Sequence, residues 1–449
     1  MEPLAPGPDR QAGKVTGTLD RYFEISERGS TIGRELRGGL VTFFTMAYIV
    51  VLNPIIIGGS ADSDHNRDAL GGYLPILQVT AVTALAAAVM CMIFGLVANY
   101  PFAIAAGLGL NSLLATTIAP EMSWAAAMGL VVIDGAIIVL LGITGARTAV
   151  FNAVPPQLKA AIAAGIGAFI AFVGLVNAGF VHRPDGGGTP VELGEGGSIA
   201  TVPTAIFVIG VLIMGVLVVR KVPGGLLVGI VVTTVLAIIA EKIWHLGAAS
   251  ADNPGGWSMS VPGLPDGVGG LPDLSLVGEV DVFGAFSGQF EHVTALIASV
   301  FVFSLVLSNF FDAMGTMTGL GKEAGLTDKE GNLPGIGKAL AVEGTGAIVG
   351  GVASASSNTV FVESASGVAE GARTGLANIM TGLLFFAAMF FSPLYEVIPL
   401  EAVAPALVVV GAMMMSQIKD IDFGDFAVGL PAFLTIVLMP FTYSITAGI

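Results

Sequence analysis

Long apolar stretches separated by short polar segments dominate the pattern of this chain. A membrane-spanning helix needs about 20 predominantly apolar residues, and such stretches recur along nearly the whole sequence. The pattern predicts an all-α integral membrane protein with about thirteen spans. The spans are expected near residues 38–57, 76–97, 101–118, 124–143, 158–177, 202–220, 224–243, 293–316, 337–353, 358–370, 375–394, 400–416 and 424–446.

The third and tenth spans do not read as continuous helices. Span three begins at Tyr100-Pro101 and runs into Gly107-Leu108-Gly109, and span ten follows a Ser- and Asn-rich break and contains Glu363. Irregular backbone at membrane depth is tolerated only where it is buried in protein or lines a cavity. We therefore expect an extended piece and then a half-helix in each span, with backbone N–H groups directed into a cavity.

The two broken spans are seven spans apart, which suggests an internal repeat. An odd offset turns the second unit upside down relative to the first, as in the inverted repeats of secondary transporters. Aligning Gly109 with Gly367 sets Phe102–Gly109 opposite Val360–Gly367, two apolar strings that end in small residues. The sequence thus predicts a seven-plus-seven inverted repeat, whose last span is missing because the chain ends near the end of span thirteen.

The distribution of Lys and Arg predicts the orientation. On the predicted topology, all 18 Lys and Arg residues except Arg67, Arg183 and Lys242 fall on one side of the membrane. The positive-inside rule assigns that side, with the N-terminus, to the cytoplasm, so we expect a multi-pass plasma-membrane protein. The loop 246–290 holds five acidic residues and no Lys or Arg, and is expected outside.

Composition excludes several classes of protein. Only 11% of the residues are charged, against about 25% in soluble domains, so a soluble fold is excluded. The net charge of −15 comes without a basic stripe, which argues against nucleic-acid binding. The single Cys91 and the scattered His65, His182, His245 and His292 indicate no metal site, and no cofactor is expected. The polar first 30 residues do not resemble a signal peptide.

Two acidic residues within apolar sequence are the main candidates for chemistry. An ionisable side chain at membrane depth costs several kcal/mol and usually faces a protein interior, a proton path or a solute. Asp312 is the only ionisable residue between Val293 and Leu320. Burial favours its neutral form, so it is a candidate proton carrier or polarising group; the alternative is a helix-packing acid. Glu363 is suited to accept hydrogen bonds from a ring N–H or an amine; the alternatives are a salt bridge and an interfacial anchor.

Further candidates surround these two acids. Asn111 offers an amide donor and acceptor to a polar heterocycle, or else bonds a neighbouring helix. Phe361 lies two positions before Glu363, so in extended backbone both side chains point to one side, unless Phe361 merely packs in the core. Gly109 and Gly367 mark the broken segments, or else only allow close helix packing. Asp134 and Glu343 also lie in apolar sequence, as proton-relay members or as packing residues.

Several motifs together resemble the adenine/guanine/hypoxanthine permeases, a branch of the nucleobase–cation symporters. The resemblance covers nearly the whole chain. It is carried by Arg21-Tyr22-Phe23 with Gly29-Ser30-Thr31, Thr42–Ile49 leading to Asn53-Pro54, Gly107–Asn111, Phe311–Thr316 and Phe361–Gly367.

The resemblance implies proton-coupled import of purine nucleobases by rocking of a core domain against a gate domain. It implies a substrate site between the broken spans at Asn111, Asp312 and Glu363, and a homodimer formed through the gate. The expected organisation is a cytoplasmic segment at 1–37, core halves at 38–150 and 291–395, gate halves at 151–245 and 396–449, and an extracellular loop at 246–290.

Two other functions stay open at this point. A transporter of xanthine, uracil or an anion has the same architecture, and an anion transporter predicts a basic residue at the site, where the sequence offers none. An intramembrane enzyme needs a metal cluster, a Ser/His pair or paired catalytic Asp residues, and none is apparent. Besides the purine and the proton, membrane lipid is the only partner that the sequence predicts.

Overall fold

The protein is described by a computed structural model over most of its length. The described residues are 17–58, 61–62, 72–146, 155–182, 190–194, 199–250, 253, 255–258, 260–265, 267–328, 333–395, 397–443 and 448. Parts of the predicted topology lie outside them, namely residues 1–16 with Arg10 and Lys14, and Arg67, Arg147, Arg183, Lys329, Ala447 and Ile449.

The apolar stretches form helices close to the predicted positions. Among the described residues, eight helical segments are long and apolar enough to cross a membrane, and two apolar helices are shorter. Span one begins at Ile32 and is interrupted at Ala47–Tyr48, which separates α2 (Ile32–Met46) from α3 (Ile49–Gly58). The other helices are α1 (Thr18–Phe23), α4 (Ile76–Val97), α6 (Trp124–Thr144), α8 (Pro156–Asn177), α9 (Val202–Val219), α10 (Gly225–Trp244), α11 (Ala295–Glu323), α12 (Ile336–Val352), α14 (Gly375–Ala388), α15 (Leu400–Met415) and α16 (Phe426–Thr442).

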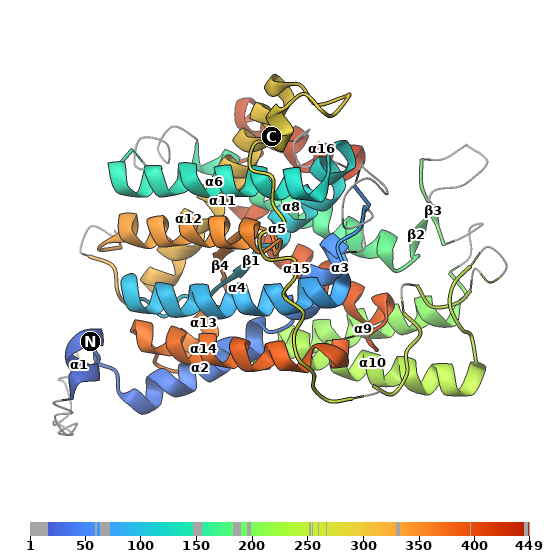
Figure 1. Cartoon of the computed structure of the whole chain (residues 1–449), viewed down its shortest axis with the longest axis horizontal. Helices are drawn as coiled ribbons and strands as arrows, with labels where there is room; N and C mark the ends of the chain where they lie inside the picture. The colour runs from blue at the N-terminus through green and yellow to red at the C-terminus, as the bar shows by residue number, and fades with distance from the viewer. Residues whose placement is uncertain are drawn as a thin grey trace.

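The helices pack in two groups. In the first group α6 packs on α12, and α14 packs on both α4 and α2. In the second group α8 packs on α15 and α16, while α9 packs on α10 and α15. In Figure 1 the helices α6, α12, α4 and α14 lie as successive layers, and α9 and α10 lie to one side of them.

The two broken spans meet in the middle of the first group. Strand β1 (Ile104–Ala106) precedes the short helix α5 (Leu108–Leu113), and strand β4 (Asn358–Val360) precedes the short helix α13 (Ser364–Ala369). The strands lie near the centre of the molecule between α4 and α12 (Figure 1). The expected extended piece and half-helix are therefore present in both spans.

The helical prediction is confirmed in outline, and the described residues add short elements that the sequence did not predict. Besides the β1–β4 pair, β2 (Val181–His182) pairs antiparallel with β3 (Glu192–Leu193). Helix α5 continues into a π-helical turn at Leu114–Ile118 and a short 3₁₀ turn at Ala119–Glu121. Three more 3₁₀ segments are Gly284–Phe286, Met389–Tyr395 and Ser416–Asp420.

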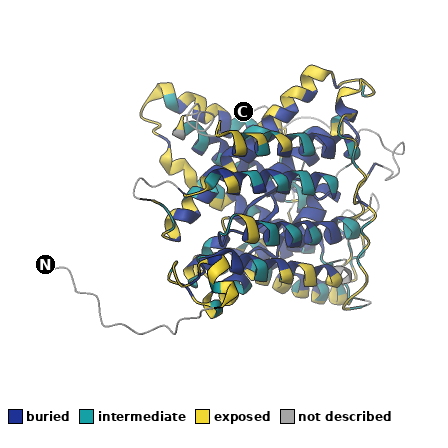
Figure 2. Ribbon diagram, turned by 60° about the vertical axis from the view of Figure 1, so that its left-hand side comes forward, coloured by how far each residue is buried: buried dark blue, intermediate teal, exposed yellow. Residues whose placement is uncertain are grey.

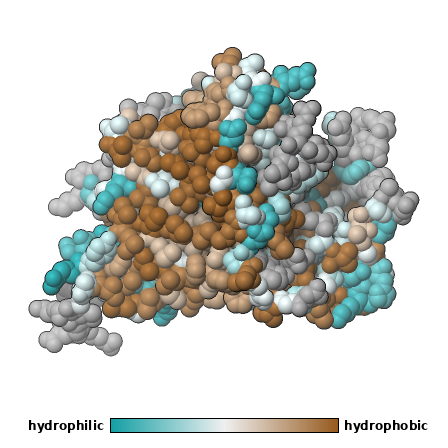
Figure 3. Space-filling model, in the orientation of Figure 1, coloured by the Kyte–Doolittle hydropathy of each residue, from teal (hydrophilic) through white to brown (hydrophobic). Residues whose placement is uncertain are grey.

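The outer surface suits a lipid environment. Figure 2 shows buried residues along the interior faces of the helices, and Figure 3 shows a broad apolar face across their sides. On α9 the side chains of Leu212 and Val219 are 64% and 82% exposed, and on α16 that of Phe441 is 82% exposed. Large exposed apolar surfaces of this kind mark contact with a membrane or another protein.

The loop 246–290 runs across one end of the molecule and contacts both helix groups. Trp257 donates from Nε1 to Glu241 of α10 at 2.8 Å, and the Ser258 N–H donates to Glu401 of α15 at 2.9 Å. Further along, the Gly278 N–H donates to the Val352 carbonyl at the end of α12, and Asp281 N–H donates to Ala125 of α6. The loop therefore ties the two groups together at this end.

Candidate substrate site

The centre of the site is the antiparallel pair formed by β1 and β4. Ile104, Ala105 and Ala106 stand opposite Val360, Thr359 and Asn358 in register. The ladder is extended at both ends, because the Gly107 N–H donates to the Ser357 carbonyl and the Phe361 N–H donates to the Ala103 carbonyl, each at 2.9 Å. These bonds satisfy backbone groups that would otherwise be costly to bury.

Side chains from three helices fix this pair in place. Cys91 of α4 donates from Sγ to the Ile104 carbonyl at 3.2 Å. Asn378 of α14 donates to the Phe102 carbonyl at 2.6 Å. The Ser364 hydroxyl of α13 accepts a bond from the Ala103 N–H at 3.0 Å and donates to the Phe361 carbonyl at 2.7 Å. The residues that follow the strands are thus held at defined positions.

Glu363 lies in the turn between β4 and α13 and is half-buried. The Tyr48 hydroxyl donates to its Oε1 at 2.5 Å. Tyr48 is buried at the interruption between α2 and α3. A hydrogen bond to a carboxylate is short and strong, so Tyr48 orients Glu363 and leaves Oε2 available to another donor.

Aromatic rings stand beside this carboxyl group. The Phe361 ring is buried, and its centroid lies 6.4 Å from that of Tyr48 with the ring planes at 50°. Such a pair presents an apolar surface next to a hydrogen-bonding carboxyl group. That combination suits a flat polar heterocycle, which stacks on rings and bonds through its edge.

Asp312 lines a cavity of about 470 Å³ next to the broken spans. Gly107, Gly109 and Val362 contribute to the same cavity from the two broken spans, and Asp312 and Glu363 are electrostatic neighbours. The cavity extends toward the end of the molecule that carries Lys159, Glu323 and Gln417.

Lys159 corrects the expectation that no basic residue lies at the site. It lines the cavity from the first turn of α8, and its Nζ lies 5.3 Å from the centroid of the Phe311 ring. A cation at this distance from a ring face is attracted to it. The sequence pattern hid this residue because Lys159 follows a Pro-rich turn and reads as part of a cytoplasmic loop.

Asn111 is buried in α5 and does not line the cavity. Neither its amide nitrogen nor its amide oxygen has a hydrogen-bond partner among the described residues. Buried polar side chains are normally satisfied, so an amide with both ends unpaired is available to a bound molecule.

The two glycines predicted at the site have different surroundings. Gly109 lines the cavity, and a methyl group on it would lie 2.9 Å from Ile166 Cγ2 of α8. Gly367 does not line the cavity; a methyl group there would lie 2.6 Å from the Gly38 carbonyl oxygen and 2.1 Å from Thr42 Oγ1, both on α2. Gly367 therefore serves close packing of α13 on α2.

Asp134 and Glu343 are fully buried on α6 and α12, away from the cavity lining. Asp134 accepts a bond from Asn309 Nδ2 at 2.9 Å, and the same nitrogen donates to Ser357 Oγ at 3.1 Å. Both acids thus belong to a polar region behind β4.

Sequence reasoning missed Tyr48 and Thr359 as parts of this region. Thr359 stands in β4, which packs against both α11 with Asp312 and α12 with Glu343. Tyr48 belongs to the Thr42–Ile49 segment that carries the family resemblance. The signal that could have identified it as a site residue is its position, as a tyrosine at the centre of an otherwise apolar first span.

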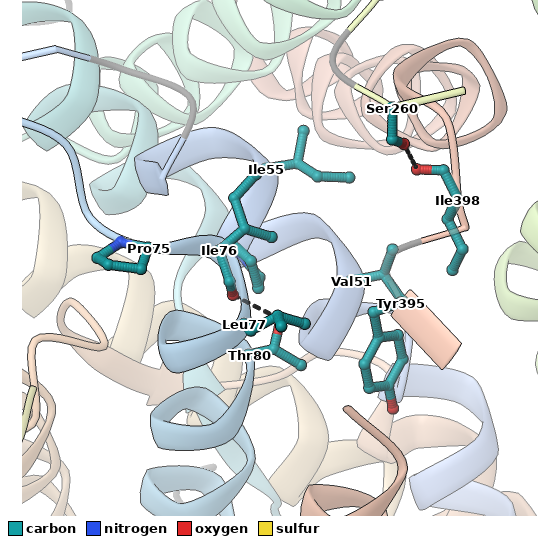
Figure 4. Close-up of a pocket in the computed structure, with 10 residues that line it drawn as sticks. Val51, Ile55, Pro75, Ile76, Leu77, Thr80, Ser260, Tyr395 and Ile398 are labelled. Carbon is teal, nitrogen blue, oxygen red and sulfur yellow. Dashed lines mark hydrogen bonds between the residues drawn. The ribbon is translucent and has the colours of Figure 1, made fainter. Parts of the chain in front are cut away.

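A second cavity of about 450 Å³ lies toward the other end of the molecule. It is formed by α3, the start of α4 and residues near the start of α15 (Figure 4). The Ser260 hydroxyl donates to the Ile398 carbonyl at its rim, at 3.0 Å, and the Thr80 hydroxyl donates to the Ile76 carbonyl. Its lining contains no Asp, Glu, Lys, Arg or His among the described residues, so the acid-lined cavity is the better candidate for a polar solute.

Comparison with known proteins places the chain in a family. The model of the xanthine/uracil permeases, described as "Permease family", matches residues 33–449. The guanine/hypoxanthine permease PbuG of Bacillus subtilis (strain 168) is 38% identical over 435 residues, which cover 96% of this chain and 91% of that protein. The adenine permease AdeQ of Escherichia coli (strain K12) is 35% identical over 97% of this chain and 88% of that protein.

Solved structures agree on the fold. The transmembrane domain of the cyanobacterial bicarbonate transporter BicA superposes with a TM-score of 0.61 at 16% identity, covering 92% of this chain and 96% of that chain. SLC26A9 superposes with a TM-score of 0.60 at 14% identity, covering 97% of this chain and 65% of that one. At such identities the likeness concerns the fold alone.

The fold and the family define this chain as a multi-pass membrane permease. It belongs to the xanthine/uracil permease family, and its relatives include adenine and guanine/hypoxanthine permeases.

Proposed function

We propose that the protein is a secondary transporter that imports purine nucleobases (adenine, guanine or hypoxanthine) together with protons. The observation that carries this proposal is the Glu363 carboxyl group, oriented by Tyr48 and flanked by Phe361 at the meeting point of the two broken spans. The names of relatives such as PbuG and AdeQ support the same substrate class.

The chemistry of the site matches a purine edge. Purines present ring N–H or exocyclic amine donors next to ring nitrogen or carbonyl acceptors. The free Oε2 of Glu363 accepts from such a donor, and the unpaired amide of Asn111 both donates and accepts. Phe361 supplies a stacking surface, and Asp312 supplies a second carboxyl group from the cavity wall.

Coupling to protons is supported by the excess of acids in and next to the site. Asp312 and Glu363 are electrostatic neighbours, and two like charges at membrane depth are costly. A proton on one of them removes that repulsion, and binding of a base that donates to Glu363 favours the ionised form of that group. Substrate and proton occupancy are thereby linked.

Movement is proposed as rocking of a core group of helices (α2, α4, α6, α11, α12 and α14) against a gate group (α8, α9, α10, α15 and α16). The separate packing of these groups and the inverted strand–helix units support this division into a seven-plus-seven repeat. The cavity opens between Asp312 of the core and Lys159 of the gate, which corresponds to a state open to the predicted cytoplasmic side.

The partners and orientation follow the same proposal. The exposed apolar faces of α9 and α16 support contact with plasma-membrane lipid, and the charge pattern supports a cytoplasmic N-terminus. A homodimer through the gate stays a prediction.

The test is uptake of radiolabelled hypoxanthine, guanine, adenine and uracil into proteoliposomes, with and without an inward proton gradient. The proposal predicts gradient-dependent accumulation of at least one purine, and loss of that accumulation in Glu363→Gln. Glu291→Gln, an exposed carboxyl group in the loop before α11, is the matched control. Normal purine transport by Glu363→Gln contradicts the role given to this residue.

Transport of an anion is the second candidate, because Lys159 lines the cavity and the fold resembles a bicarbonate transporter. Two features favour the purine. The same cavity wall holds Asp312 and Glu323, whose charges oppose an anion, and the central carboxyl group of Glu363 forms no ion pair with a cation among the described residues. Uptake of bicarbonate in the same vesicles, without uptake of any nucleobase, favours the anion.

A further inference from the structure

Four carboxyl groups form a series that leads from the substrate site into the core: Asp312 is exposed and lines the cavity, Glu363 is half-buried, and Glu343 and Asp134 are fully buried. Asp312 of α11 lines the cavity together with Val362, the residue before Glu363. Strand β4 packs against both α11 and α12, which carries Glu343, and α12 packs against α6, which carries Asp134. The first two belong to the proposed substrate site. The last two lie behind β4 and contribute nothing to the cavity lining.

Glu343 and Asp134 stand at the closest crossing of α6 and α12. Each acid directly precedes a glycine of this crossing, Gly344 and Gly135 respectively. A methyl group on Gly135 would lie 2.5 Å from the Gly344 carbonyl oxygen, and one on Gly344 would lie 2.8 Å from the Gly135 carbonyl oxygen. The two backbones are therefore in direct contact, and the acids are fixed beside them.

The hydrogen-bonding capacity of this pair is largely unused. Both carboxyl oxygens of Glu343 and Oδ1 of Asp134 are buried without a partner among the described residues. Asp134 Oδ2 accepts the single bond from Asn309. A pair of acids kept only for packing would be expected to have satisfied oxygens, since unpaired buried polar atoms cost about 1–3 kcal/mol each.

Within the part of the chain that the structure describes, no counter-charge neutralises the pair. The elements packed against α12 are α4, α6, α11, β1 and β4. Their ionisable groups are Cys91 on α4, Asp134 on α6, and Asp312, Lys322 and Glu323 on α11; the strands have none. Lys322 lies ten residues from Asp312, about 15 Å along the helix, and Lys338 on α12 lies at the helix start, more than a turn from Glu343.

Two ionised carboxyl groups without a cation are strongly disfavoured in a medium of low dielectric constant. The pair therefore holds at least one proton. Thr359 is placed to connect the pair to the substrate site, because β4 packs against both α11, which carries Asp312, and α12, which carries Glu343. Its buried hydroxyl group has no hydrogen-bond partner among the described residues.

We propose that the Glu343–Asp134 pair is a separate residence site for the coupled proton, reached from Asp312 through the Thr359 hydroxyl. This inference rests on the proposed proton-coupled transport and assigns its two tasks to different residues. Glu363 binds the base, and Glu343 holds the proton while the base crosses.

The transfer step balances within the residues named. The Asp312 carboxylic acid gives its proton to the Thr359 oxygen, while the Thr359 hydroxyl gives its own proton to the Glu343 carboxylate. Asp312 is left as a carboxylate, Thr359 regains a hydroxyl group and Glu343 becomes a carboxylic acid. The reverse step returns the proton when the site faces the other side.

The experiment compares binding, exchange and accumulation in the full chain carrying Glu343→Gln. Hypoxanthine binding is measured on purified protein. Exchange is measured as entry of labelled hypoxanthine into vesicles preloaded with the unlabelled base, and accumulation is measured under an inward proton gradient. We expect binding within about threefold of the unmodified protein, retained exchange, and accumulation that falls to passive equilibration.

Two further variants keep the test decisive if Glu343→Gln does not fold. Asp134→Asn removes the second member of the pair, and Thr359→Val removes only the connecting hydroxyl while keeping its shape. Both are expected to lose accumulation and retain exchange, whereas the control Glu291→Gln keeps both. Monodispersity in gel filtration identifies which variants are folded.

Accumulation at the unmodified level in a folded Glu343→Gln or Thr359→Val variant overturns the proposal. Accumulation driven by a sodium gradient, and abolished by Glu343→Gln, also overturns it by assigning the site to another ion. These outcomes are distinct from failure of the proposed function, in which the unmodified protein neither binds nor transports any purine.

Discussion

The Tyr48 hydroxyl donates a 2.5 Å hydrogen bond to Glu363 across 315 residues of sequence. The bond joins the interruption in the first span to the turn between β4 and α13. It fixes one carboxyl oxygen and leaves the other for a ligand. Tyr48 is therefore a positioning residue, which acts on the substrate through Glu363.

Tyr48→Phe is predicted to weaken purine binding while leaving the fold intact. A hydrogen bond to a charged group contributes about 1.5–3 kcal/mol, which corresponds to roughly a tenfold or larger increase in Kd. The measurement is equilibrium binding of labelled hypoxanthine, with the exposed Tyr73→Phe as control. An unchanged Kd in Tyr48→Phe would show that the carboxyl group is oriented by other contacts.

Gly135→Ala is predicted to destabilise the protein, since its methyl group meets the Gly344 backbone at 2.5 Å. Overpacking a close contact costs about 1–3 kcal/mol, because two helices must separate. Thermal unfolding in detergent checks this, and Gly215→Ala on α9, with no atom within 4 Å of the added methyl group, is the matched control. Equal melting temperatures for both variants contradict the tight α6–α12 crossing.

Gly109→Ala is predicted to slow transport more than it weakens binding. The added methyl group meets Ile166 Cγ2 at 2.9 Å, at the contact between α5 and α8, and α8 belongs to the proposed gate group. Rates of labelled-base exchange and Kd are compared in the same preparation. Ile166→Ala removes the obstructing Cγ2 atom, so the double variant Gly109→Ala/Ile166→Ala is expected to regain the exchange rate of the unmodified protein. If the double variant is as slow as Gly109→Ala alone, this contact is not the cause of the slow transport.

Trp257→Phe is predicted to lower thermal stability, because the Trp257 indole donates to Glu241 and is 1% exposed. Loss of this bond to a charged group costs about 1.5–3 kcal/mol. The control is Trp244→Phe, whose side chain is 55% exposed. If both variants melt alike, the loop 246–290 does not anchor on α10 through Trp257.

Much of the architecture follows from the periodic apolar stretches. The positions of the helices and the breaks in spans three and ten were predictable because Pro101, Gly107 and the polar stretch before Glu363 conflict with continuous helix. The strand pairing itself was not predictable from local pattern. It depends on Cys91, Asn378 and Ser364, whose bonds to β1 and its flanks join distant segments.

The candidate site was predicted in part. Asp312 and Gly109 line the cavity, whereas Phe361 and Glu363 are not in its lining and stand on either side of the lining residue Val362 in the sequence. Gly367 packs on α2 instead, because small residues serve close packing and cavity lining equally well and sequence does not separate the two. Lys159 was hidden because it stands in the first turn of α8, directly after a Pro-rich segment that reads as a loop.

Gradient-driven purine accumulation tests the central claim most directly. Proteoliposomes holding the unmodified chain are given labelled hypoxanthine with an inward proton gradient, and then with the gradient collapsed by a protonophore. We predict accumulation above the outside concentration that disappears when the gradient is collapsed and is absent in Glu363→Gln. Accumulation that is unchanged when the proton gradient is collapsed, or that persists in Glu363→Gln, would contradict the account.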